Sequence, residues 1–111
     1  MKVLLLEDNL MWSVRVRKGL ESLGHKVTVA TEPSEADLAI VNLGARAFDP
    51  FAAIATLKEG GTTVIGHVGH KEKDTWKRGE EAGCDKVVSN GTLANRLKAV
   101  IDDVVKLQTE R

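Results

Sequence analysis

Short apolar runs alternate along this chain with longer amphipathic stretches, and this alternation constrains the fold more strongly than any other feature. The apolar runs predict five strands, at residues 3–6, 25–30, 37–42, 62–68 and 85–89. Strands that alternate with helices form a parallel sheet covered by helices on both faces. Strands that are apolar throughout fit burial on both faces. The sequence therefore predicts one α/β domain over residues 1–111.

The helices are predicted from capping residues and apolar periodicity. Asn9 is a candidate N-cap for a helix that runs to about Leu23 and stops at Gly24. Asp49 and Pro50 suit the start of a second helix. Residues 71–82 form a third, and a last helix begins near residue 92. The apolar side chains expected on the sheet side of the first helix are Trp12, Val16, Leu20 and Leu23. Those of the last helix are Leu93, Leu97, Val100, Ile101 and Val104.

One connection is too short for the usual pattern. Only residues 31–36 lie between the second and third predicted strands. A parallel crossover normally needs a dozen or more residues, and this segment reaches at most about 20 Å when extended. We expect an extended loop or a single helical turn here. A patch of the sheet would then lack its cover, and an uncovered apolar patch usually marks an interface.

Composition excludes several classes of protein. The chain balances 16 basic against 16 acidic residues, unlike the basic surface of a nucleic-acid-binding protein. An apolar fraction of 42% fits a globular domain. The first apolar run ends at Glu7 and Asp8 and is too short for a signal peptide or a membrane span. The single cysteine, Cys84, suits a reducing cytosol. We therefore expect a cytoplasmic protein that binds neither nucleic acid nor membrane.

Polar residues gather where the predicted strands end. Residues 7–8 follow the first strand, Asn42 ends the third, residues 67–69 lie at the end of the fourth, and residues 89–90 end the fifth. In open parallel sheets, ligands bind beyond the carboxyl ends of the strands. Any chemistry of this chain is therefore expected at this edge.

Several stretches, in this order and spacing, resemble the receiver domain of bacterial response regulators. They are "VLLLEDN", "GLESLGHKVTVAT", "DLAIVNLGARAFDPF" and "EEAGCDKVV", and the match covers nearly the whole chain. The resemblance implies the flavodoxin-like, CheY-like fold, a doubly wound five-stranded parallel sheet in order 2-1-3-4-5 with five helices. Because the second connection is short, we expect the second helix to be shortened or missing.

The resemblance also implies which positions would carry phosphotransfer. In receiver domains an aspartate at the end of the third strand accepts a phosphoryl group. It holds magnesium together with an acid of the pair and a nearby carbonyl. A threonine or serine on the fourth strand and a lysine on the fifth contact the phosphoryl group. At these positions this chain has Asn42, Val68 and Asn90, and only the acidic pair, Glu7 and Asp8, remains.

Each replacement removes a chemical function. The Asn42 amide is not a usable nucleophile toward phosphorus. Val68 cannot hydrogen-bond a phosphoryl oxygen, and Asn90 cannot supply the charge of a lysine. We predict a non-enzymatic pseudo-receiver, a protein-binding module that phosphate does not switch. Its degenerate pocket consists of Glu7, Asp8, Asn42, Val68 and Asn90.

A second hypothesis keeps a residual role for the same pocket, either as a phosphorelay receiver or as a sensor of a divalent metal or small ligand. Glu7 and Asp8, with the side-chain oxygen of Asn42 and the carbonyl of Gly44, would hold magnesium weakly. The competing interpretation is a solvated acidic pair with no metal and no cofactor.

The partner of a pseudo-receiver is expected to be a signalling protein, namely a histidine kinase, a regulator, a motility or output protein, or a second copy of the chain. Trp76 lies in a helix with few apolar residues, as an exposed aromatic anchor or partly buried on the sheet. Val87 stands where receiver domains carry an aromatic switch residue. Leu10 and Val14 fall outside the core side of the first helix, although scattered exposed apolar residues are common.

Other polar residues carry weaker signals. His67 and His70, with an acid, suggest a transition-metal site. Their spacing in a loop fixes no common face, so a strand histidine and an exposed loop histidine are expected instead. Cys84 has no evident activating base and is expected to be a buried, inert thiol. Residues 90–91, Asn-Gly, predict a turn before the last helix.

Overall fold

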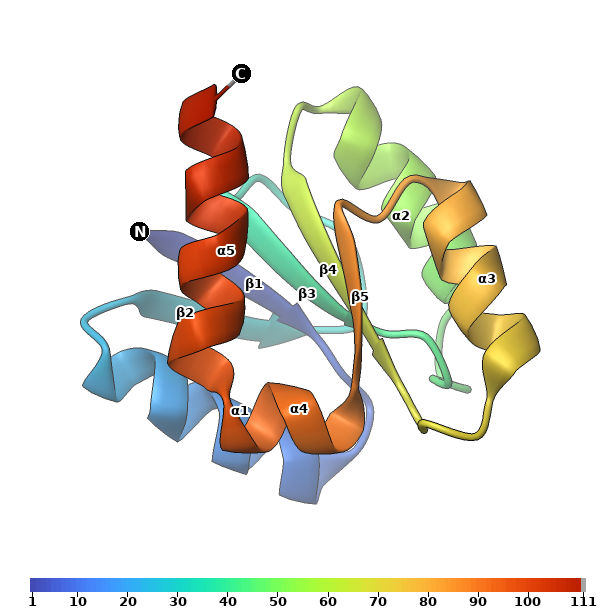
Figure 1. Cartoon of the computed structure of the whole chain (residues 1–111), viewed down its shortest axis with the longest axis horizontal. Coiled ribbons are helices and arrows are strands. Elements are labelled where there is room, and N and C mark those ends of the chain that lie inside the picture. The colour runs from blue at the N-terminus through green and yellow to red at the C-terminus, as the bar shows by residue number, and fades with distance from the viewer. Residues whose placement is uncertain (111) are drawn as a thin grey trace.

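The computed structural model describes residues 1–110, which form a five-stranded parallel sheet with helices on both faces (Figure 1). The strand order β2-β1-β3-β4-β5 is the predicted one. The strands are β1 (Lys2–Leu6), β2 (Lys26–Ala30), β3 (Leu38–Asn42), β4 (Thr63–Val68) and β5 (Lys86–Ser89). The helices are α1 (Leu10–Ser22), α2 (Pro50–Glu59), α3 (Lys73–Ala82), α4 (Asn90–Asn95) and α5 (Leu97–Glu110). Across residues 1–110, none of the helices combines the length and the apolar character needed to cross a membrane.

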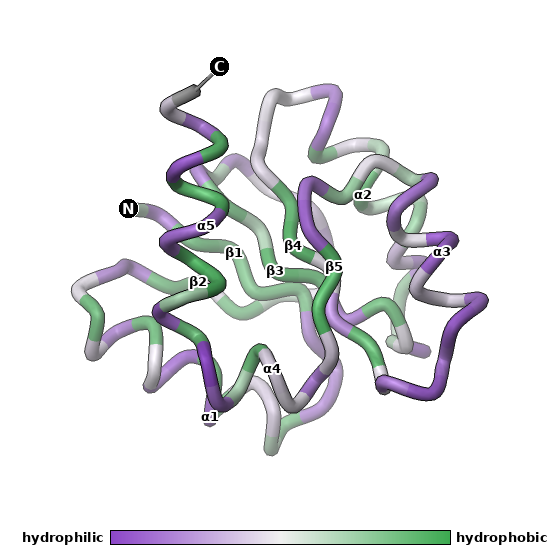
Figure 2. Tube along the Cα trace, in the orientation of Figure 1, coloured by the Kyte–Doolittle hydropathy of each residue, from purple (hydrophilic) through white to green (hydrophobic). Residues whose placement is uncertain are grey.

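The sheet separates two apolar layers. Val3 and Leu5 of β1 belong to the layer covered by α1, α4 and α5, and Leu4 and Leu6 belong to the layer covered by α2 and α3. The inner strands are almost wholly buried, as their continuous apolar runs predicted. Figure 2 shows the strands as the most hydrophobic segments, whereas α3 is mostly hydrophilic. The carboxyl ends of the strands are therefore positioned by packed apolar layers on both faces of the sheet.

The first helix begins and ends close to its predicted bounds. The side-chain oxygen of Asn9 accepts a hydrogen bond from the Trp12 backbone N–H at 3.1 Å, as an N-cap residue does. Val16 and Leu20 are buried against the sheet, and Trp12 packs partly buried beside them. Leu23 is 38% exposed, because it lies past the end of the helix where the chain turns toward β2. The predicted sheet side is therefore right except for its last residue.

Residues 31–37 connect β2 to β3 without a helix, as predicted. The expected apolar patch is not found beside this connection. Lys26 and Thr28 are exposed on the side of β2 that a helix would cover. Leu4 in the neighbouring strand is only 1% exposed, and Ala36 of the connection packs against its layer. The missing helix is therefore accompanied by polar residues on β2, and this region is not an apolar interface.

The C-terminal segment differs from the single helix that its apolar pattern predicted. It forms α4 and α5, which are separated at Arg96, where φ is −130° and ψ is 36°. Asn90 and Gly91 are the first residues of α4 rather than a turn before a helix, and Ser89 caps them. Figure 1 shows α5 at a steep angle to α4. This change of direction allows both helices to bury apolar residues on the same face of the sheet.

Two glycines bring α3 close to the sheet. A Cβ atom on Gly66 of β4 would lie 2.9 Å from a methyl carbon of Leu43, and one on Gly79 of α3 would lie 2.6 Å from the same carbon. Both distances are shorter than packed side chains allow. Leu43, which follows Asn42, thus fills a notch between β4 and α3. Gly83 ends α3 with a φ of 111°, a conformation that favours glycine.

Candidate functional site

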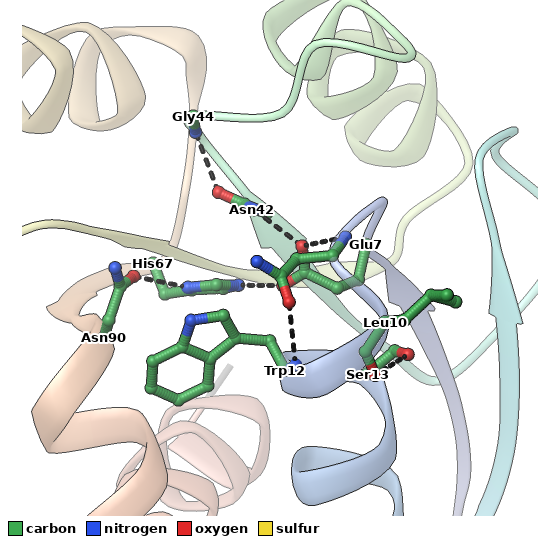
Figure 3. A network of polar contacts seen from close by, with 9 residues as sticks. Glu7, Leu10, Trp12, Ser13, Asn42, Gly44, His67 and Asn90 are labelled. Carbon is green, nitrogen blue, oxygen red and sulfur yellow. Dashed lines mark hydrogen bonds and ion pairs between the residues drawn. The ribbon is translucent and has the colours of Figure 1, made fainter.

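The carboxyl ends of β1, β3 and β4 and the first residue of α4 meet in one polar network (Figure 3). Glu7 follows β1, Asn42 ends β3, and Asn90 begins α4. The structure thus brings together three of the five residues predicted for the pocket. His67 of β4, which was not predicted to belong to the pocket, lies between Glu7 and Asn90.

Glu7 is the buried member of the acidic pair. Its side chain is 0% exposed. Oε2 accepts hydrogen bonds from Asn42 Nδ2 at 2.6 Å and from the Asn9 backbone N–H at 3.2 Å. Oε1 lies 3.0 Å from His67 Nε2. A buried carboxylate is strongly destabilising unless its oxygens are bonded in this way.

His67 connects this acid to α4. Its side chain is 1% exposed, and Nδ1 lies 2.7 Å from Asn90 Oδ1. The Trp12 ring packs beside the imidazole, with the ring centres 6.2 Å apart. The sequence predicted a strand histidine, with a transition-metal site as the alternative. One signal was missed, because His67 pairs in register with Asn42 and a residue at that position reaches the strand-end pocket.

Asp8 has a different role from Glu7. Its Oδ2 accepts hydrogen bonds from the backbone N–H groups of Ala47 at 3.0 Å and Arg46 at 2.7 Å. These backbone hydrogen bonds hold the pKa of the Asp8 carboxyl below its ordinary value. Asp8 therefore fastens the loop after β3 to the end of β1.

The remaining positions of the predicted pocket are apolar or already bonded. Val68 is 3% exposed and packs in the layer beneath α2 and α3. The Asn90 amide oxygen is engaged by His67. Neither side chain provides a hydroxyl group or a positive charge for a phosphoryl group.

The receiver fold implies a magnesium ion at this edge, and the residues present do not fit one. The Asn42 oxygen, one of the predicted ligands, accepts a hydrogen bond from the Gly44 backbone N–H at 2.9 Å. The Asn42 Nδ2 group points at Glu7, and Asp8 is bonded to the loop backbone. Magnesium requires several free oxygen ligands in near-octahedral geometry. Among residues 1–110, no cluster of three or more His, Cys, Asp or Glu side chains is placed to hold a metal.

An open hollow of about 430 Å³ lies above the network. Trp12, Arg46, Val68 and Glu72 are among the residues that border it. Its volume is within the range of small-molecule sites, but its borders mix both signs of charge with apolar groups.

The candidate partner-binding residues lie in two places. Leu10 and Val14 of α1 are 81% and 43% exposed, and Met11, which was not among the predicted candidates, is 84% exposed. Trp76 is half-buried on α3 and packs against the same layer as Val87. The partial burial of Trp76, one of the two alternatives, is therefore what the structure shows. A role of any of these residues in binding stays a prediction.

The other two sequence candidates are simple cases. His70 is exposed in the loop before α3, as expected. Cys84 is half-buried, and its burial, together with the nearby Asp85 carboxylate, raises the pKa of the thiol to about 12. A thiol with this pKa is an unreactive group at neutral pH.

A parallel sheet with the order β2-β1-β3-β4-β5 and helices on both faces is the fold of response regulator receiver domains. The receiver domain of the TMAO respiratory system response regulator TorR matches with a TM-score of 0.82 and 16% identity, over 94% of this chain and 95% of that one. A signal receiver domain of an HD domain-containing protein from Pseudomonas fluorescens gives 0.82 and 16%, over 99% and 98%.

A signal receiver domain of a modulated diguanylate cyclase from Desulfovibrio desulfuricans gives a TM-score of 0.79 and 23% identity, over 99% and 98% of the two chains. No protein-family model and no curated relative matches the chain. At such low identities the likeness establishes the fold, and function has to be argued from the site.

Proposed function

We propose that the chain is a pseudo-receiver, a signalling module that binds a partner protein and is not switched by phosphate. The observation that carries this proposal is the 2.6 Å hydrogen bond from Asn42 Nδ2 to Glu7 Oε2. It places a bonded donor at the position where a phosphoacceptor needs a free carboxylate nucleophile. The Asn42 amide takes part in the hydrogen-bond network through both its nitrogen and its oxygen, so the site differs from that of a receiver domain by more than a missing carboxylate.

An aspartate would not fit at position 42 without other changes. It would replace the donor with a second carboxylate against the buried Glu7 oxygen. Two carboxylates at this distance repel each other unless a cation lies between them. The second oxygen of Glu7 is already taken by His67. Restoring the acid alone is therefore not expected to restore phosphotransfer.

The module is proposed to act in the cytoplasm through its surfaces and not as an enzyme. Its partner would be a histidine kinase, another regulator, a motility or output protein, or a second copy of the chain. Two surfaces are candidates. The α1 surface consists of the exposed side chains of Leu10, Met11 and Val14. The α3 surface consists of Trp76 and Val87.

Phosphate independence is tested with a small phosphodonor. The purified protein is incubated with acetyl phosphate and magnesium, and its intact mass is measured. No added phosphoryl mass is expected for the wild type or for Asn42→Asp, while a functional receiver domain treated in parallel gains one. A phosphoryl adduct on the wild-type protein would contradict the proposal.

Partner binding is tested with surface variants. A tagged wild-type protein is used to isolate its partner from the source cells, with and without the phosphodonor, and the amount recovered is expected to be equal. Trp76→Ala and Leu10→Ser identify the surface used, and Lys98→Ala, at an exposed position of α5, is the matched control. If both surface variants bind the partner as the control does, the two surfaces are wrongly assigned.

The hollow above the network favours a second candidate, a sensor of a small ligand or ion. Amide NMR of the protein, titrated with magnesium and then with beryllofluoride, separates the two functions. Saturable shifts of the amide signals around Asp8, Asn42 and Val68 would favour the sensor over the pseudo-receiver. If these signals do not shift, the result supports the pseudo-receiver.

A further inference from the structure

The edge strand β2 is open along its outer side. The strand order places β2 and β5 at the two edges of the sheet (Figure 1). No residue of β5 is exposed, whereas Lys26, Thr28 and Val29 of β2 are exposed. The connection that follows β2 contains no helix, and its residues 31–35 are all exposed. Proteins usually cover or shorten an edge strand, because its free backbone groups can pair with another chain. The edge of β2 is therefore a surface that a further strand can extend.

The hydrogen bonds to β1 show which backbone groups of β2 face this open edge. The Lys26 N–H donates to the Met1 carbonyl at 3.0 Å, and the Ala30 carbonyl accepts a hydrogen bond at 3.3 Å from the residue that follows β1. Successive residues of a strand direct their N–H and C=O groups to opposite sides, so the even-numbered residues of β2 bond to β1. The N–H and C=O groups of Val27 and Val29 therefore point outward from the sheet.

The charges beside this edge are separated by sign. Lys26 begins β2 and lies opposite Lys2 of β1 in register. Glu32 and Glu35 follow the other end of the strand. All four side chains belong to exposed residues, and within residues 1–110 none of them forms an ion pair. One end of the edge is thus basic and the other acidic. This arrangement complements itself when a second copy of the chain runs in the opposite direction.

We propose that β2 pairs antiparallel with β2 of a second copy, about a two-fold axis at Thr28, and joins the two sheets into one. In this register Val27 of each copy exchanges both backbone hydrogen bonds with Val29 of the other. Lys26 lies opposite Ala30 of the second copy and diagonal to its Glu32, within reach of a long side chain. Val29, which is 38% exposed, gains an apolar neighbour in Val27 of the second copy.

The neighbouring registers fit less well. Side chains of paired residues share one face, so the register can shift only in steps that keep this alternation. With the axis at Val27, each Lys26 would lie diagonal to Lys26 of the other copy, and like charges repel. With the axis at Val29, Val27 would pair with Thr31, which lies outside the strand. The axis at Thr28 is the one that pairs all residues of both strands and sets Lys26 near an acid.

This inference makes the second copy the partner of the proposed signalling module, and in that respect it rests on the proposed function. The contact lies at β2, apart from the α1 surface and the α3 surface. It does not require phosphate independence, which the intact-mass measurement tests separately. A monomeric protein without a phosphoryl adduct would therefore overturn the dimer alone, and a dimeric protein that accepts a phosphoryl group would overturn the pseudo-receiver alone.

Charge exchange between the two ends of β2 tests the interface. Sedimentation equilibrium of the whole chain is expected to show a dimer that dissociates on dilution, as a small interface does. Lys26→Glu and Glu32→Lys should each weaken the dimer about tenfold or more, because they place like charges together, and the double variant should restore it. Glu81→Lys, at an exposed position of α3, is the control for net charge. A wild type that stays monomeric at about 1 mM, single variants that dimerise like the control, or a double variant without recovery would overturn the proposal.

A disulfide across the two-fold axis tests the register. The two copies of Thr28 form a non-hydrogen-bonded pair with Cα atoms about 4.5 Å apart, which is within the range of a disulfide. Thr28→Cys is therefore expected to form a covalent dimer under mild oxidation, seen on a non-reducing gel. In the matched control, Lys26→Cys, the two cysteines would lie about 13 Å apart along the strands and should not cross-link. The wild type, treated in parallel, controls for Cys84. Equal cross-linking of the two variants, or none in Thr28→Cys, would overturn this register.

Discussion

Glu7 and Asp8 are consecutive residues, and their surroundings differ in almost every respect. The Glu7 carboxylate is enclosed and shares hydrogen bonds with side chains from β3 and β4. The Asp8 carboxylate lies at the surface and holds two backbone N–H groups of the following loop. One acid connects strands and the other fastens a loop. An acidic pair at a strand end therefore does not establish a metal site, because the partners of each acid decide its role.

The largest effect on the free energy of unfolding is expected for the buried acid, Glu7. Glu7→Ala removes the acceptor of the His67 ring and of the Asn42 amide. Breaking a buried pair by removing one partner costs roughly 3–5 kcal/mol, and urea unfolding should show a loss in this range. Glu59→Ala, an exposed acid at the end of α2, is the control and should change stability by less than about 0.5 kcal/mol. A loss below about 1 kcal/mol for Glu7→Ala would mean that the network is not tightly formed.

A smaller loss is expected when the donor at position 42 becomes an acid. Asn42→Asp replaces a hydrogen bond to Glu7 with a like-charge contact, and we expect the free energy of unfolding to fall by about 2 kcal/mol. Asn95→Asp, at an exposed position of α4, is the matched control, and urea unfolding at pH 7 measures both. Equal stability of Asn42→Asp and the wild type would show that Asn42 and Glu7 are not in contact.

For the exposed acid, Asp8, we expect a modest and pH-dependent effect on the free energy of unfolding. Asp8→Ala should cost about 1 kcal/mol at pH 7, since it removes hydrogen bonds from two backbone groups near the surface. The pKa of Asp8 is lowered in the folded state. Its stabilisation is therefore complete above the unfolded value of about 3.9 and is lost as the pH falls through the folded value. The difference between variant and wild type should narrow between pH 5 and pH 2 in urea unfolding, and a constant difference would contradict this assignment.

The smallest effect on stability is expected just beyond the acidic pair. Leu10 is 81% exposed, so Leu10→Ser should change the free energy of unfolding by less than about 0.5 kcal/mol. Its effect should appear only in the affinity for the partner, measured by titration calorimetry once the partner is known. Loss of stability in this variant would show that Leu10 is covered within the domain.

The sequence predicted the fold well because its signals are local. The Asn9 cap and the alternating apolar runs each identify an element from neighbouring residues, and residues 31–36 are too few for a helix whatever else surrounds them. The strand order came from the resemblance to receiver domains. The break at Arg96 carries no glycine or proline signal, because packing of both helices on one face of the sheet determines it.

The site was predicted only in part. The positions of Glu7, Asn42 and Asn90 followed from where the strands end. The role of His67 did not, because its partners lie 60 residues away in Glu7 and 23 residues away in Asn90. The separate roles of Glu7 and Asp8 depend likewise on groups that come together only in the folded chain.

The missing helix between β2 and β3 has a practical consequence for protein engineering. Residues 31–35 are all exposed, and they connect two strands without belonging to either apolar layer. Inserted segments are tolerated best at exposed loops of this kind, and each doubling of loop length costs only about 0.6 kcal/mol. A fluorescent reporter or an affinity tag placed here would lie beside α2, where Pro33, Ser34 and Glu35 share a hollow with Thr56 and Leu57, and it would replace no residue of the α1 surface or the α3 surface.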